Sequence, residues 1–164
     1  MPGQMNLHGS SRWKVRDKRK FLIAAMAELA GDAHLSLEGD LSATQVLDLA
    51  GASGNETAVL KRSTTWPVQD FVVLPLETDL ITTIVASIGG TVPRGVLHLQ
   101  IEKRGQLQLG LYDGFRPAAS FFGPRLTPEF FAKLEAEGVL SRITPLSSRP
   151  KCRRRVHGKT EKCF

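Results

Sequence analysis

Cysteine and long hydrophobic runs are both scarce in this sequence, and each absence excludes a class of protein. The two cysteines, Cys152 and Cys163, lie among residues 149–164, so no disulfide can cross-link a folded core. No run of about 18 apolar residues is present, which excludes a membrane-spanning helix. A chain of 164 residues can bury a sufficient core without disulfides or metals. The sequence therefore predicts a single soluble domain.

The sequence also lacks the usual motifs of catalysis and metal binding. It contains no phosphate-binding Gly-x-x-x-x-Gly-Lys loop, no Gly-x-Ser-x-Gly, no His-Glu-x-x-His and no calcium-binding loop. The segment IGGTVPRG at 88–95 has three glycines but no following lysine. Cys152, His157 and Cys163 offer three zinc ligands at most, without a Cys-x-x-Cys pair. We expect no cofactor and no metal, and the balance is against an enzyme.

The N-terminal segment has a basic stretch followed by apolar residues, as a signal peptide does. The apolar stretch FLIAAMAELA at 21–30 is short for this purpose, contains Glu28 and follows twenty residues of polar chain. Two cysteines with no role in the core also fit a reducing compartment. The sequence predicts a cytoplasmic protein.

Charge is distributed unevenly along the chain. Residues 21–148 hold nine bases and fourteen acids, whereas the net charge of +6 arises from basic stretches at 12–20 and 149–164. The acidic middle favours a protein partner, and a basic one in particular, because complementary charge steers association. The basic ends suggest the alternative of nucleic-acid binding. The residues that would carry this alternative are Arg12, Lys14, Arg16, Lys18, Arg153, Arg154 and Arg155.

Hydrophobic periodicity predicts an α+β fold, with an antiparallel or mixed sheet and helices packed on one face. Helices are expected from Trp13 to Gly31, from Thr78 to Gly89 and from Thr127 to Gly138. The apolar run at 70–77 indicates a central strand, and 35–41 indicates a half-buried strand whose outer face carries Ser36, Glu38 and Asp40. We expect a disordered leader at 1–11, one domain at 12–146 and a basic, unstructured tail at 147–164.

The stretch VLHLQIEKRGQLQLGLYDGF at 96–115 predicts a β-hairpin at 96–112, because leucine and isoleucine alternate with polar residues on both arms. A two-residue turn would pair Glu102 with Leu107 and mix the two faces. A three-residue loop at 103–105 pairs Glu102 with Gln106 instead and keeps the leucines together, with Gly105 at the left-handed position.

The polar face of this hairpin has two interpretations, a solvated side of the sheet or a binding surface. It carries His98, Gln100 and Glu102 on one arm and Gln106, Gln108, Gly110 and Tyr112 on the other. Glu38 and Asp40 would join this face if strand 35–41 is its neighbour. Asp113 lies in the turn that follows, where binding residues often occur. The candidate binding residues are Glu38, Asp40, His98, Gln100, Glu102, Gln108, Tyr112 and Asp113.

Three functions fit these features. In size, architecture and acidic surface the chain resembles immunity proteins that neutralise bacterial toxins, and the segments LSLEGD and IEKRGQLQLGLYDGF are similar to those of an uncharacterised bacterial family. This resemblance implies a non-enzymatic, protein-binding module. Nucleic-acid binding through the basic ends is the first alternative. The second is a small hydrolase or transferase that uses His98 or His34 with Glu38, Asp40 or Asp113.

Overall fold

The computed structural model describes residues 12–89, 92 and 95–143, and within them it confirms the α+β class. The predicted leader at 1–11 and tail at 147–164 lie outside these residues. The elements are, in chain order, β1 (Arg12–Val15), α1 (Lys18–Leu29), β2 (Ala33–Gly39), η1 (Val46–Asp48), β3 (Asp70–Leu76), η2 (Thr78–Leu80), α2 (Ile81–Ser87), β4 (Val96–Lys103), β5 (Gln106–Leu111), η3 (Pro117–Ala119), β6 (Phe121–Phe122), α3 (Pro128–Ala136) and β7 (Leu140–Ile143).

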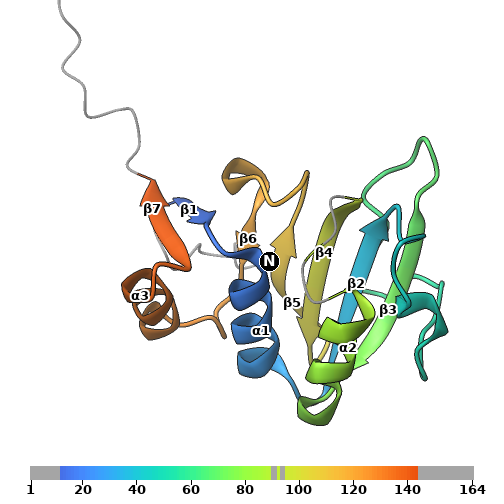
Figure 1. The fold of residues 1–164 in the computed structure, drawn as a ribbon, viewed down its shortest axis with the longest axis horizontal. Helices are drawn as coiled ribbons and strands as arrows, with labels where there is room; N and C mark the ends of the chain where they lie inside the picture. Colours follow the sequence, from blue (N-terminus) through green and yellow to red (C-terminus); the bar gives the residue numbers. More distant parts are fainter. Residues whose placement is uncertain (1–11, 90–91, 93–94, 144–164) are drawn as a thin grey trace, which may run out of the picture.

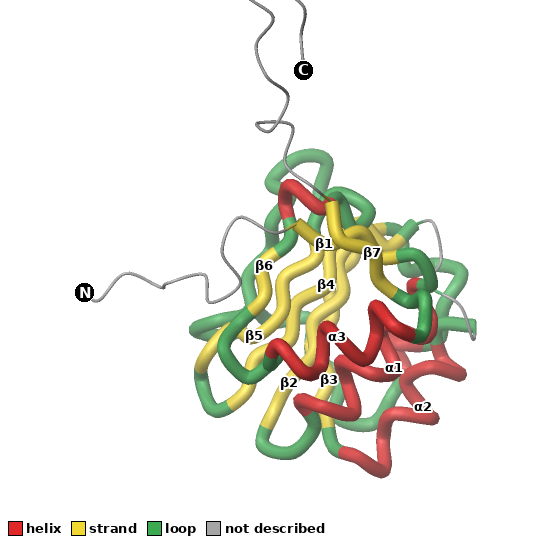
Figure 2. The backbone as a smooth tube through the Cα atoms, turned by 90° about the vertical axis from the view of Figure 1, so that its left-hand side faces the viewer, coloured by secondary structure: helices red, strands yellow, loops and turns green. Residues whose placement is uncertain are grey.

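A five-stranded antiparallel sheet with the order β3-β2-β4-β5-β6 forms the centre of the fold. The three α-helices gather on one side of it, as predicted (Figures 1 and 2). The alternating apolar residues of β2, β4 and β5 meet the apolar side of α1 in one continuous core. Its members include Phe21, Leu22, Met26, Leu35, Leu37, Leu99, Ile101 and Leu109.

The predicted helix from Trp13 is wrong in its first turns. Residues 12–15 form β1, which pairs with β7 in a separate two-stranded sheet. Trp13 and Val15 alternate with exposed bases, and Trp13 stacks on Phe131 with ring centroids 5.2 Å apart. The helix begins at Lys18, because the Asp17 side chain caps it by accepting a hydrogen bond from the Lys20 backbone N–H.

The strand at 70–77 is present but it lies at the edge of the sheet, not at its centre. Pro75 explains this position, since proline cannot donate to a further strand. Ser53 forms an isolated bridge with Val73 on the outer side of β3 and so pairs part of that edge. The continuous apolar run at 70–77 arises because both faces of β3 are buried. A central strand and a covered edge strand are both buried in this way, so the pattern does not distinguish them.

The hairpin has the two-residue turn that the sequence argument rejected. Arg104 and Gly105 both have positive φ, 51° and 75°, as a tight hairpin turn requires. Glu102 therefore pairs with Leu107, and a β-bulge skips Gln108 so that Ile101 pairs with Leu109. The bulge restores the apolar alternation that a longer loop was expected to preserve.

Candidate functional site

The centre of the predicted polar face is buried and not solvated, whereas Asp40, Gln106 and Asp113 are exposed. It forms on the side of the sheet away from the helices, where the register pairs Glu38 with His98 and Ser36 with Gln100. Glu102 continues it on β4. We call these five residues the polar row; none is more than 7% exposed. Burial of polar groups requires hydrogen-bond partners, and the covering chain provides them for Glu38, His98 and Gln100.

Residues 55–69, between η1 and β3, lie over the polar row and are called the covering segment. Leu60 anchors it at 0% exposure, against Phe71, Val73 and Leu107. Leu107 reaches this side of the sheet because of the bulge. The structure has no strand at 56–66, only irregular chain held by side chains.

Backbone N–H groups of the covering segment donate to the polar row at three points. The carboxylate of Glu38 accepts from Ser63 at 2.7 Å and from Thr64 at 2.9 Å. Gln100 Oε1 accepts from Lys61 at 3.3 Å. An irregular segment cannot satisfy these donors within itself, so buried side chains do so. The row thus holds the segment in place.

Both ring nitrogens of His98 form hydrogen bonds in this network. The backbone N–H of Asp113 donates to Nδ1 at 3.1 Å, and a backbone N–H can only donate, so Nδ1 carries no proton. Nε2 must then carry the proton and donate to Thr64 Oγ1 at 2.9 Å. His98 is a structural link between the covering segment and the turn after β5, without a free nitrogen for proton transfer.

Other candidates from the sequence are structural as well. Gln108 is 0% exposed, and its Oε1 accepts from the Arg125 backbone N–H at 3.0 Å. Tyr112 is half-buried, with its hydroxyl accepting from Gln100 Nε2 at 2.8 Å. Asp40 and Asp113 are the candidates whose side chains are exposed. Hydrogen bonds from the Ser42 hydroxyl and backbone N–H lower the pKa of Asp40.

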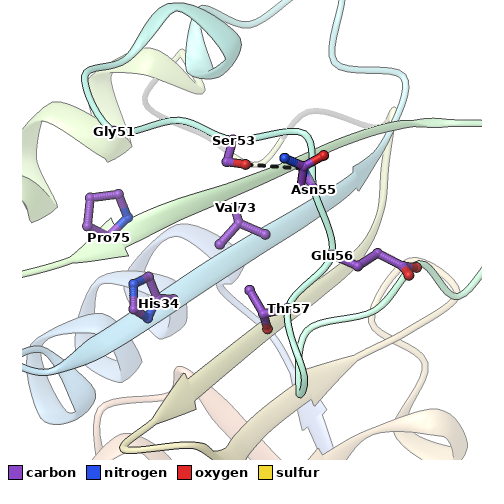
Figure 3. A pocket seen from close by; sticks show the side chains of 8 residues that line it. All are labelled: His34, Gly51, Ser53, Asn55, Glu56, Thr57, Val73 and Pro75. Atoms are coloured by element: carbon purple, nitrogen blue, oxygen red, sulfur yellow. Dashed lines mark hydrogen bonds between the residues drawn. The ribbon is translucent and has the colours of Figure 1, made fainter.

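His34 pairs with Glu102, not with the carboxylates that the enzymatic alternative assigned to it. Its Nδ1 lies 2.6 Å from Glu102 Oε1, and Glu102 Oε2 accepts from the Gly105 backbone N–H. The imidazole borders a pocket of about 300 Å³ between β3 and the covering segment (Figure 3). The lining residues are His34, Gly51, Ser53, Asn55, Glu56, Thr57, Val73 and Pro75.

A carboxylate that orients a histidine is half of a general-base site. The other half, a nucleophile or second acid, does not meet His34 among the residues described. Ser53 Oγ accepts from the Asn55 N–H, and Thr57 Oγ1 accepts from the N–H groups of two following residues. In Figure 3 the Glu56 carboxylate points away from His34. Within the described ranges no three metal-ligating side chains cluster. Within the described residues, the side-chain hydrogen bond that His34 forms is thus the one with Glu102.

The most exposed large apolar residues of the described chain lie in the covering segment, outside the residues that the sequence analysis named as candidates. Trp66 is 83% exposed and Val68 is 71% exposed, on either side of Pro67 in the covering segment. We call residues 66–68 the tip; the Trp66–Pro67 peptide bond is cis. The loop that carries it projects beside β3, away from the helices (Figure 1). The sequence feature that could have indicated this site is Trp66, a tryptophan that belongs to no periodic apolar pattern.

The basic residues of the nucleic-acid alternative are only partly placed. Lys14, Arg16 and Lys18 are exposed on β1 and at the start of α1. Arg16 Nε donates to Ser141 Oγ at 2.9 Å, and Lys18 Nζ lies 5.1 Å from the Phe115 ring centroid. The backbone of Arg12 belongs to β1, whereas residues 153–155 lie outside the described ranges.

Comparison with protein-family models, curated proteins and solved structures finds no match to this chain. Among the described residues, no helix combines the length and the apolar character that crossing a bilayer requires.

Proposed function

We propose that the protein is a non-enzymatic, cytoplasmic protein-binding module that docks its partner through the tip. The observation that carries this proposal is the exposure of Trp66, 83%, beside Val68 at 71%. Exposed apolar side chains that adjoin one another mark interaction sites, and tryptophan is enriched among the residues that dominate binding energy. The contact surface is thus the tip, with the polar row as its support.

Anchoring of the covering segment supports the same proposal, because a rigid loop loses less entropy on binding. Glu38 and His98 hold Ser63 and Thr64 just before the tip, and β3 begins just after it. Burying an indole removes roughly 150–250 Å² from water, which corresponds to about 4–6 kcal/mol at about 25 cal/mol per Å². One such side chain can dominate an interface.

Two related interpretations remain part of the proposal. Toxin neutralisation, as in the immunity proteins that the sequence resembles, is a specific form of protein binding in which the partner is a bacterial toxin. Nucleic-acid binding is the alternative, supported by the exposed Lys14 and Arg16. That mode would depend on salt and on phosphate contacts and would not need the tip.

A photo-crosslinking experiment tests the proposal. A photoreactive phenylalanine analogue replaces Val68 in the full chain, and the same analogue replaces Leu47 as a control, because Leu47 is 48% exposed on η1, outside the tip. After irradiation in nuclease-treated native extract, we expect a discrete protein adduct at position 68 and none at 47. The same adducts at both positions, or none at either, would contradict the proposal.

A further inference from the structure

Three exposed aspartates are connected to the chain on either side of the tip. Asp70 follows the covering segment directly, and its Oδ2 accepts from the Leu41 backbone N–H at 3.0 Å, which brings it beside Asp40. Asp113 is linked to the covering segment through His98, which contacts both its backbone N–H and the Thr64 hydroxyl. All three side chains are exposed. We call them the acidic rim.

The rim is not neutralised by the described residues. The ion pairs found among them involve Glu102, Asp32 and Glu135, and none of these belongs to the rim. The hydrogen bonds from Ser42 favour the ionised form of Asp40, whose pKa is lowered. Within the described residues, no cation therefore forms an ion pair with the rim.

Neither cation of the covering segment, Lys61 or Arg62, forms an ion pair with the acidic rim. Arg62 is exposed, but its guanidinium lies 4.9 Å from the Phe71 ring centroid, and Nη1 donates to the Gln69 carbonyl at 2.8 Å. Lys61 is exposed, but it lies five residues before Trp66, on the far side of the Ser63 and Thr64 anchors. Trp66 and Val68 themselves are flanked by uncharged residues.

We propose that the partner is a folded protein with an apolar cleft bordered by arginine or lysine side chains, the cleft receiving Trp66 and the basic border meeting the acidic rim. This inference rests on the proposed function and adds the chemistry of the partner. An apolar centre with a charged, polar edge is the usual anatomy of a protein interface, and opposite charges at the edge raise the association rate. A polyanion such as nucleic acid would meet like charge here.

The test uses a yeast-displayed library of small folded domains with a randomised concave surface as the probe. Binders are selected on the full-length protein and counter-selected on the Trp66→Ala variant, which has the same basic ends. We expect the randomised positions of the binders to be enriched in Arg and Lys over Asp and Glu. Binders that discriminate the two proteins without such enrichment would overturn the inference and leave the proposed function standing.

A charge-removal variant provides the second readout. Asp40→Asn/Asp70→Asn/Asp113→Asn keeps an acceptor oxygen at each position, so the bonds to Ser42 and Leu41 can form, and thermal melting verifies folding. Selected binders should lose about tenfold in affinity at low salt, with a smaller loss at high salt because screening weakens the contribution of the rim. An unchanged affinity would overturn the inference. Glu28→Gln/Asp48→Gln serves as the control. Failure to recover any binder that depends on Trp66 would contradict the proposed function as well.

Discussion

Replacing Glu38 with alanine should destabilise the protein and release the covering segment. The carboxylate accepts from the backbone N–H groups of Ser63 and Thr64 at 2.7 and 2.9 Å while 2% exposed. A hydrogen bond to a charged group contributes about 1.5–3 kcal/mol. Two such bonds are lost, but the variant avoids the cost of burying a charge and water reaches part of the segment. We expect a net loss of about 2–4 kcal/mol in unfolding free energy.

Thermal melting and amide hydrogen exchange measure this effect. For a chain of this size the loss corresponds to a fall of about 5–15 °C in Tm. Exchange should accelerate most at the amides of Ser63 and Thr64, because they lose their acceptor. Glu28→Ala removes an exposed carboxylate of α1 and should change the stability by less than about 0.5 kcal/mol. Unchanged stability together with unchanged exchange at both amides in Glu38→Ala would refute the reasoning.

Three further substitutions test other parts of the fold. A Cβ at Gly39 would lie 2.0 Å from a backbone carbonyl oxygen, so Gly39→Ala should lower the unfolding free energy by roughly 4 kcal/mol or more in a denaturant titration. A Cβ at Gly105 would have no atom within 4 Å, so Gly105→Ala should cost only about 1–2 kcal/mol, for its positive φ. Similar costs for the two variants would contradict this prediction. Ser42→Ala should raise the pKa of Asp40 toward 3.8 in an NMR titration. Because the pKa of Asp40 is lower in the folded protein, its ionisation stabilises the fold above the unfolded pKa, and this stability is lost as pH falls through the folded pKa. The unfolding free energy of Ser42→Ala should therefore differ from that of wild type above pH 4 and not in strong acid. Leu60→Ala should cost about 2–5 kcal/mol by opening a cavity under the covering segment, and a smaller value in calorimetry would show that the segment is not anchored there.

The sequence predicted the existence of the three helices, both ends of α3 and most of the apolar side of the sheet, because these depend on local features. Thr127, Pro128 and Gly138 mark the start and end of α3 as expected. Leu99, Leu109 and Leu111 of the hairpin lie on the side that faces the helices, whereas Leu107, expected with them, lies on the other side because of the bulge. Strand order depends on distant pairing, and so the edge position of β3 and the pairing of β1 with β7 were missed.

The polar row was identified by its spacing, but its environment could not be predicted from spacing alone. Alternation assigns His98 and Gln100 to the side of the sheet away from the core. That side is expected to be solvated when helices cover only the other side. The covering segment has no periodicity, so nothing local indicates that it lies over the sheet. Its tryptophan is exposed because the anchors lie at Leu60 and Thr64, a consequence of tertiary contacts.

The most direct test of the account compares wild-type protein with Trp66→Ala in binding to the partner identified by crosslinking at position 68. Tm should stay within about 2 °C, because an exposed side chain contributes little to stability. Affinity should fall at least about 100-fold, as for a residue that dominates an interface, while Leu47→Ala binds like wild type. Undiminished binding by a folded Trp66→Ala variant would contradict the account.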